Sequence, residues 1–461
     1  MLLSVLFTLA LHQVGCDVVV TNSGSVRGQR AVDGSSTFLG IPYALVDEEN
    51  PFGKSLEFPK FETVFNASNS SVICPQVRRI EGGVLQCLRL NIFVPNITNL
   101  NRLVPVFVWF HGGGFSIGSG GQYDGKYLAQ HGIIVVTVNY RLGPYGFFCL
   151  KDPDVPGNQG LKDQVTALRW IKDNIRAFGG NPDEVTIAGE SFGGGAVDLH
   201  LYSENERLFN KAIIQSGSAE VTGMFVKPDH DAAIKLGKQL GYNTTNTKDA
   251  LKYLATVDPI VLMKAANNIN FLPRVCKEKR YKGVQHFVTE DPFHLNNSTI
   301  IKNTSILIGY NSKEDFGGFV GKSNEFYANM SSIFYDKLKN TFDFKEEELR
   351  SLAKIIQSFY MGGKKFSKDS MLELVDFSSD FVLNHAAESA VNRYMEQGAL
   401  KVYKYLFSYV GGSDFKDIPG VGAAHTEELQ YLFDKGTTFT DEQILIRDRM
   451  TTMWANFVKY G

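Results

Sequence analysis

The stretch VTIAGESFGGGAV, residues 185–197, places Ser191 between two glycines directly after an apolar, β-branched run. Within it, the pattern GESFG is typical of a nucleophilic serine on a sharp turn between a strand and a helix. Side chains at the Gly189 and Gly193 positions would collide with neighbouring backbone in such a turn. The same pattern also occurs in ordinary glycine-rich loops, so the interpretation depends on partners elsewhere in the chain.

A serine hydroxyl is a weak nucleophile at neutral pH, so Ser191 would need a base, usually a histidine that a carboxylate orients. Backbone N–H groups must also stabilise the oxyanion that forms when the hydroxyl attacks a carbonyl. The loop HGGGF follows an apolar run and can supply such donors from its glycines, with the N–H of Phe192 as a further donor. A phosphate-binding loop is a poor alternative, because no Lys-Ser or Lys-Thr pair follows these glycines.

Two later segments offer the acid and the base, in the order in which they follow the serine in strand–turn–helix sites. The segment ILIGYNSKEDF offers Glu314 and Asp315 just after a predicted strand, and both carboxylates are candidates for the acid. The segment GVGAAHTEEL offers His425 in a loop of small residues ahead of an amphipathic helix. Isolated histidines are mostly structural or exposed, but this loop and the company of Ser191 make His425 the leading base.

The elements that would position these residues alternate along the chain. Continuous apolar runs at Val104–Phe110 and Ile133–Tyr140 predict strands that are covered on both faces. Later strands are predicted at VTIAG, KAIIQSG, SILIGY and VYKYLFSY, and GLKDQVTALRWIKDNIRAF predicts a helix that ends at two glycines. This alternation predicts an α/β fold with an open, mainly parallel sheet. Two helical insertions, about residues 228–272 and 325–394, are expected over its carboxyl edge.

The bulk composition narrows the class of partner and the compartment. Lys and Arg number 47 against 49 for Asp and Glu, a net charge of -2, which argues against a nucleic-acid partner. The N-terminal MLLSVLFTLALHQVGC predicts a secretory signal peptide over residues 1–16, with a domain at 17–461, although an early positive charge is missing. A buried N-terminal strand is the alternative. No later apolar run is long enough for a transmembrane helix.

Cysteines and sequons agree with secretion. Cys74 and Cys87 flank a polar, glycine-bearing loop that a disulfide could close in an oxidising compartment. Cys149 follows the aromatic run YGFF and is expected to be a buried thiol, while the pairing of Cys276 stays open. Predicted N-glycosylation sites, in which Ser or Thr stands two residues on, are Asn66, Asn69, Asn96, Asn243, Asn296, Asn303 and Asn329; Asn297 also has this pattern.

A long ordered set of segments resembles the type-B carboxylesterases, which include cholinesterases and insect esterases within the α/β-hydrolase fold. The resemblance runs from FLGIPYA near the N-terminus to MWANFVKYG at the end, and takes in HGGGF, VNYRLGPYGFF, QSGSA, GYNSKE and GAAHTEEL. It implies Ser191 as nucleophile, His425 as base, and Glu314 as acid, since the family's acid follows the strand-ending glycine, here Gly309, by five residues. The implied oxyanion donors are the N–H groups of Gly113, Gly114 and Phe192.

The resemblance implies a secreted serine hydrolase of apolar carboxylic esters that needs no metal or organic cofactor. A non-catalytic adhesion or binding protein, or a slow covalent scavenger, is the alternative. Phe192 stands where the family usually has Ala, and Asp315 where it has a small residue. The loop between Cys74 and Cys87 lacks the family's choline-binding Trp, which argues against a cholinesterase. Because relatives continue beyond NFVKYG, we expect the domain to lack their usual C-terminal portion.

Overall fold

The computed structural model describes residues 17–461 except 79–80, 97–101, 292–293, 295–297, 412–417 and 419. The predicted signal peptide and the sequons at Asn296 and Asn297 lie outside the described residues. Within the described part of the chain, no helix combines the length and apolar character needed to cross a membrane.

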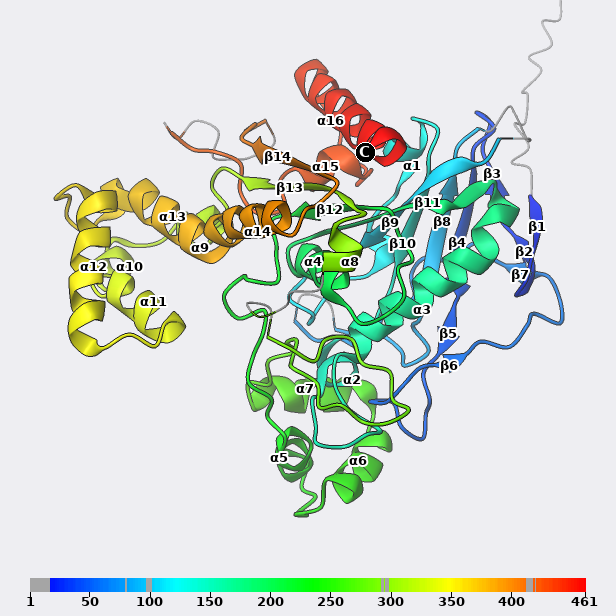
Figure 1. The fold of residues 1–461 in the computed structure, drawn as a ribbon, viewed down its shortest axis with the longest axis horizontal. Coiled ribbons are helices and arrows are strands. Elements are labelled where there is room, and N and C mark those ends of the chain that lie inside the picture. Colours follow the sequence, from blue (N-terminus) through cyan, green and yellow to red (C-terminus); the bar gives the residue numbers. More distant parts are fainter. Residues whose placement is uncertain are drawn as a thin grey trace, which may run out of the picture.

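A nine-stranded sheet forms the centre of the molecule (Figure 1). Its strands lie in the order β14-β13-β12-β11-β9-β10-β8-β4-β3. The strands from β14 to β10 run parallel, and β8, β4 and β3 extend the sheet antiparallel. The prediction of an open, mainly parallel α/β sheet is therefore confirmed. The strands span β3 Gln29–Arg30, β4 Ser36–Pro42, β8 Arg89–Val94, β9 Val104–Phe110, β10 Ile134–Val138, β11 Gly180–Glu190, β12 Lys211–Gln215, β13 Ser305–Asn311 and β14 Lys401–Phe407.

Two small sheets lie outside the large one. One has three strands in the order β1-β2-β7, and the other pairs β5 with β6. Their bounds are β1 Val18–Thr21, β2 Gly24–Arg27, β5 Ala44–Leu45, β6 Leu56–Glu57 and β7 Phe65–Asn66.

Helices α3 and α4, which flank the sheet, lie where the sequence predicts helices. Helix α3, Gln159–Asn174, continues into a short 3-10 turn and ends at Gly179, whose φ of 85° is a left-handed conformation that suits glycine. Helix α4 begins directly after Ser191. The other helices of this part are α1 Lys126–Ala129, α2 Gly143–Phe147, α4 Phe192–Tyr202, α8 Ser298–Ile301, α15 Leu429–Leu432 and α16 Asp441–Tyr460.

Both predicted insertions are helical and extend away from the sheet. Figure 1 shows α5, α6 and α7 at the bottom of the molecule and α10 to α13 at its left. The first group packs around Leu236, Leu254 and Leu262, and the second around Phe334 and Leu374. Their bounds are α5 Ala232–Gln239, α6 Thr247–Ala255, α7 Pro259–Asn268, α9 Phe316–Phe319, α10 Asn324–Ala328, α11 Ile333–Thr341, α12 Glu346–Met361, α13 Met371–Ser379, a π-helical turn η5 Asp380–Asn384, and α14 His385–Glu396.

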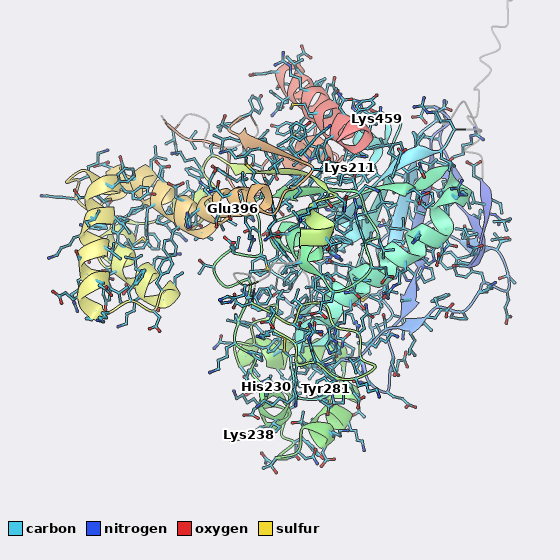
Figure 2. All side chains as sticks on the ribbon, in the orientation of Figure 1. Lys211, His230, Lys238, Tyr281, Glu396 and Lys459 are labelled. Atoms are coloured by element: carbon cyan, nitrogen blue, oxygen red, sulfur yellow. A yellow bond between two sulfur atoms is a disulfide. The ribbon has the colours of Figure 1, made fainter. Side chains whose placement is uncertain are left out.

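Helix α16 covers one face of the sheet with apolar and polar contacts. Trp454 belongs to a buried cluster with Trp109 and Phe433. Lys211, labelled in Figure 2, reaches the last turn of α16, where its Nζ donates to the carbonyl oxygen of Val458 at 2.9 Å. The indole N–H of Trp454 donates to Oε1 of Gln215 at 2.9 Å, at the carboxyl end of β12. This helix is therefore connected to the sheet edge at which Ser191 lies.

Two disulfides tie the chain together. The predicted Cys74–Cys87 bond is present. The expectation that Cys149 is a free buried thiol is wrong, because it pairs with Cys276 across 127 positions. Gly157 makes room for this bridge, since a Cβ there would lie 2.7 Å from the sulfur of Cys276. A bridge between such distant segments depends on the fold and leaves no local signal around Cys149.

The described sequon asparagines share one property. All of them are exposed: Asn66, Asn69, Asn96, Asn243, Asn303 and Asn329. Each is accessible to a modifying enzyme, so glycosylation at these positions stays a prediction.

Replacing both Cys149 and Cys276 by Ser should lower the free energy of unfolding by about 2–5 kcal/mol, because the unfolded chain loses its long-range constraint. Denaturant titration under non-reducing conditions measures this change. The matched control is Cys74→Ser with Cys87→Ser, which opens a much shorter loop and should cost less if loop entropy dominates. An unchanged unfolding midpoint in the Cys149/Cys276 variant would contradict the expectation.

Candidate active site

Ser191 occupies a strained turn between β11 and α4. Its φ of 58° and ψ of -128° are conformations that a residue with a side chain rarely adopts. Two backbone hydrogen bonds hold the turn: the N–H of Ser191 donates to Gln215 O at 2.9 Å, and Ser191 O accepts from the N–H of Gly195 at 2.9 Å. The strain is therefore fixed by the adjacent strand β12 and by the first turn of α4.

The glycines around Ser191 are required by close backbone contacts. A Cβ at Gly189 would lie 2.4 Å from Gly193 O, and one at Gly193 would lie 2.2 Å from Phe110 O. Gly217, after β12, lies equally close to the turn, since a Cβ there would lie 2.1 Å from Ser191 O. The GESFG pattern is thus explained by the packing of this turn against β9 and β12.

The predicted oxyanion loop follows β9 and has an unusual backbone. Gly113 and Gly114 have φ values of 101° and 64°. Among the residues that the structure describes, their N–H groups make no hydrogen bond. Phe192 is the first residue of α4, so its N–H has no acceptor within the helix. Among the described residues, these three N–H groups therefore have no acceptor, at the sites where the sequence predicts oxyanion donors.

The acid and base candidates are in direct contact. His425 Nδ1 lies 2.6 Å from Oε2 of Glu314, which follows β13. The other carboxylate oxygen of Glu314 accepts from the backbone N–H of Asn311 at 2.6 Å. The N–H of His425 also donates to Glu314 O at 3.2 Å. Glu314 thus fixes both the ring and the backbone of His425.

The outer nitrogen of His425 faces a residue that the sequence reasoning did not single out. Nε2 lies 3.0 Å from Oε1 of Glu190, the residue before Ser191. In the described part of the chain, Ser191 Oγ has no hydrogen-bond partner. The structure therefore brings Glu314 and His425 together, whereas Nε2 is turned to Glu190. The only signal for Glu190 in the sequence is its place in GESFG.

A third buried carboxylate completes the surroundings of His425. Glu428 accepts from Gln215 Nε2 at 3.0 Å and from Asn311 Nδ2 at 2.6 Å. Its exposed fraction is 0%, against 2% for Glu190 and 3% for Glu314. Glu428 belongs to the GAAHTEEL segment, but nothing in that segment indicates that it turns back toward β12 and β13.

Burial and charge shift the proton affinities of this cluster. Burial raises the pKa of Glu190, and the neighbouring carboxylates of Glu428 and Glu314 raise it further. Burial alone would lower the pKa of His425, but the carboxylates of Glu190 and Glu314 outweigh it and raise the pKa. His425 and Glu190 together therefore hold a proton more tightly than either group would alone.

Phe192, which stands where the family usually has Ala, lines the same cavity as Ser191. The ring packs edge-on against Phe115 at a centroid distance of 5.1 Å. On its other side the guanidinium of Arg274 lies 4.7 Å from the ring centroid. Arg274 Nη1 also donates to Gly114 O at 3.2 Å, so this contact links Phe192 to the oxyanion loop.

Asp315 has its own partners. Its carboxylate accepts a hydrogen bond from the hydroxyl of Ser378, and its N–H donates to Oγ of Ser379 at 3.0 Å. Asp315 therefore contacts the end of α13, while the hydrogen bond to His425 comes from Glu314.

A cavity of about 560 Å³ contains the candidate residues. Ser191, His425 and Glu314 line it together with Phe192 and Arg274. Apolar side chains from the second helical insertion and the loop after β12 make up much of the remaining wall: Val221, Met224, Val382 and Leu383. The arrangement provides a hydroxyl nucleophile, a carboxylate-oriented imidazole, unpaired N–H donors and an apolar space, which are the parts that acyl transfer needs.

Comparisons with known proteins agree with this chemistry. A family model described as the carboxylesterase family matches residues 15–461. A juvenile hormone esterase of Heliothis virescens is 32% identical over 95% of this chain and 84% of its own length. Esterase FE4 of Myzus persicae is 31% identical over 92% and 80%, and acetylcholinesterase 4 of Caenorhabditis briggsae is 32% identical over 98% and 82%. The chain therefore belongs to the carboxylesterase family and is a carboxylic ester hydrolase.

Proposed function

We propose that the protein is a secreted serine esterase that cleaves apolar carboxylic esters through an acyl-serine intermediate. The observation that carries this proposal is the cavity in which Ser191, on its strained turn, faces the same space as the His425–Glu314 pair. Ester hydrolysis itself follows from the family, whereas the residues, the intermediate and the substrate class are our inference.

In the proposed reaction, Ser191 Oγ attacks the carbonyl carbon of the ester and gives its proton to Nε2 of His425. The N–H groups of Gly113, Gly114 and Phe192 stabilise the tetrahedral oxyanion. As the C–O bond to the alcohol breaks, His425 returns the proton to the leaving oxygen. Water then attacks the acyl-serine by the same route, releasing the acid and the free hydroxyl.

The position of Glu190 adds a condition to this reaction. Because Nε2 lies 3.0 Å from Glu190 Oε1, it must exchange this contact for the hydroxyl of Ser191 before it can accept a proton. Only the neutral imidazole can act as the base, and the carboxylate of Glu190 favours the charged form. Glu190 therefore sets the pH at which His425 becomes active.

The cavity wall supports the proposed preference for apolar esters. The disulfides and the exposed sequons support the proposed secretion. Val221, Met224, Val382 and Leu383 line the space in front of Ser191. The disulfides Cys74–Cys87 and Cys149–Cys276 are of a kind that forms in oxidising compartments, and the described sequons are exposed. Together with the N-terminal apolar segment, these features favour export of the chain.

The purified protein should hydrolyse 4-nitrophenyl butyrate, and Ser191→Ala should lower kcat at least about 1,000-fold, because no other group replaces the nucleophile. Release of 4-nitrophenolate measures the rate, with butyrylcholine as a comparison substrate. The matched control is Ser218→Ala, a buried serine near the same turn, which should retain activity if it folds. Activity that survives in Ser191→Ala, or a strong preference for the choline ester, would contradict the proposal.

Glu190→Gln should shift the acid limb of the pH profile of kcat/KM to lower pH, by about one unit. Removing the carboxylate removes a charge that stabilises the imidazolium, so His425 loses its proton at a lower pH. The control variant Glu190→Asp keeps the charge and should keep the limb closer to that of the wild type. A limb that stays in place or moves to higher pH in Glu190→Gln would show that Glu190 does not set the pKa of His425.

A further inference from the structure

A second cavity of about 550 Å³ lies next to the candidate active site and is not used by the proposed reaction. We call it the η5 pocket, because Asp380, Phe381 and Asn384 of the π-helical turn line it. Val382 and Leu383, from the same turn, line the active-site cavity instead, so η5 forms part of both walls. In Figure 1, α13 and α14, on either side of η5, lead from the helical group at the left back toward the sheet. Single π-helical turns within α-helices, such as η5, are frequent at functional sites.

Asp380 carries a negative charge in this pocket that no basic side chain balances. Its carboxylate accepts hydrogen bonds from the hydroxyl of Tyr360 and from Nδ2 of Asn384, each at 2.8 Å. Among the described residues, no Lys, Arg or His forms an ion pair with it; Lys337 lies 6.0 Å from the ring centroid of Phe381 without reaching the carboxylate. Asp380 is therefore hydrogen-bonded but not neutralised.

The other carboxylates of the pocket differ in this respect. Glu388 is paired with Lys404 at 2.8 Å and also accepts from the hydroxyl of Tyr310. Glu220 is paired with Arg393 at 2.7 Å. Since both already have cationic partners, the unbalanced charge of the pocket belongs to Asp380.

Asn384 fixes the position of the Asp380 carboxylate. The exposed fraction of Asn384 is 8%, and its Oδ1 has no hydrogen-bond partner among the described residues. The orientation of the amide is determined by Asp380, because only the NH₂ side can donate to a carboxylate. The carbonyl oxygen is thus buried beneath the pocket surface and closed to a molecule in the pocket, so Asn384 acts by holding the carboxylate of Asp380.

The remaining wall suits an organic cation. Phe342, Tyr360, Phe377 and Phe381 line the pocket, and the rings of Tyr360 and Phe377 pack edge-on with centroids 5.4 Å apart. Aromatic faces attract cations and bury apolar surface. The pocket therefore combines an unbalanced carboxylate with an aromatic wall.

We propose that the η5 pocket binds a protonated primary or secondary amine attached to an aromatic or apolar body. The ammonium donates to the carboxylate of Asp380, and the body lies against the aromatic side chains. A quaternary ammonium carries no N–H and cannot donate a hydrogen bond to the carboxylate of Asp380. Neutral and anionic ligands leave the charge of Asp380 unbalanced. Recognition in this pocket does not depend on the reaction at Ser191.

The test is direct binding of 2-phenylethylamine to the full chain at pH 7, measured by isothermal titration calorimetry. The amine should show saturable binding, because it is protonated at this pH. Two probes of similar shape serve as controls on the unaltered protein: 2-phenylethanol, which is neutral, and the N,N,N-trimethyl derivative, which has the charge but no N–H. Both should bind at least about tenfold more weakly.

Variants then assign the site. Asp380→Asn should weaken binding of the amine about tenfold or more, because it removes the charge of the acceptor. Asp376→Asn is the matched control: it lies on α13 one turn earlier, is paired with Lys313 and does not line the pocket, so binding should be unchanged. Thermal unfolding of both variants shows whether they fold. Absence of saturable binding, equal binding of the neutral alcohol, or unchanged binding in a folded Asp380→Asn variant would each overturn the proposal.

Discussion

The hydrogen bond between His425 Nδ1 and Oε2 of Glu314 is the contact on which the active-site region depends. The carboxylate of Glu314 is buried away from water, and a buried carboxylate is stable only when its oxygens have hydrogen-bond partners. Asn311 supplies the second partner of Glu314 and also donates to Glu428, which in turn accepts from Gln215. Gln215 then accepts from Trp454 of α16. The position of the imidazole is thus connected through buried polar groups to β12, β13 and the helix that covers the sheet.

The nucleophile is held by a different kind of constraint. Ser191 adopts a strained backbone conformation because β9, β12 and α4 approach it so closely that only glycine fits at several neighbouring positions. The turn lies at the carboxyl end of β11, which has β9 on one side and β12 on the other. Ligand sites in open α/β sheets occur at such carboxyl ends. Backbone packing therefore fixes the serine, whereas side-chain hydrogen bonds fix the histidine.

The sequence predicted the parts of the molecule that depend on local patterns. Apolar runs located β9 and β10, and glycine spacing identified the turn at Ser191. In the family resemblance, the five-residue spacing from Gly309 led to Glu314 in preference to Asp315, and the hydrogen bond to His425 agrees with that choice. What the sequence did not reveal depends on contacts between distant segments. Cys149 meets Cys276, and Nε2 of His425 meets Glu190, only because the fold brings them together.

The most direct test of the account is covalent labelling with diisopropyl fluorophosphate followed by mass spectrometry of the peptides. The account predicts one phosphoryl group per chain, on Ser191, and loss of ester hydrolysis in proportion to labelling, because the reagent reports an activated serine. Label on another residue, or hydrolysis that continues when Ser191 is fully labelled, would contradict the central claim that Ser191 is the nucleophile.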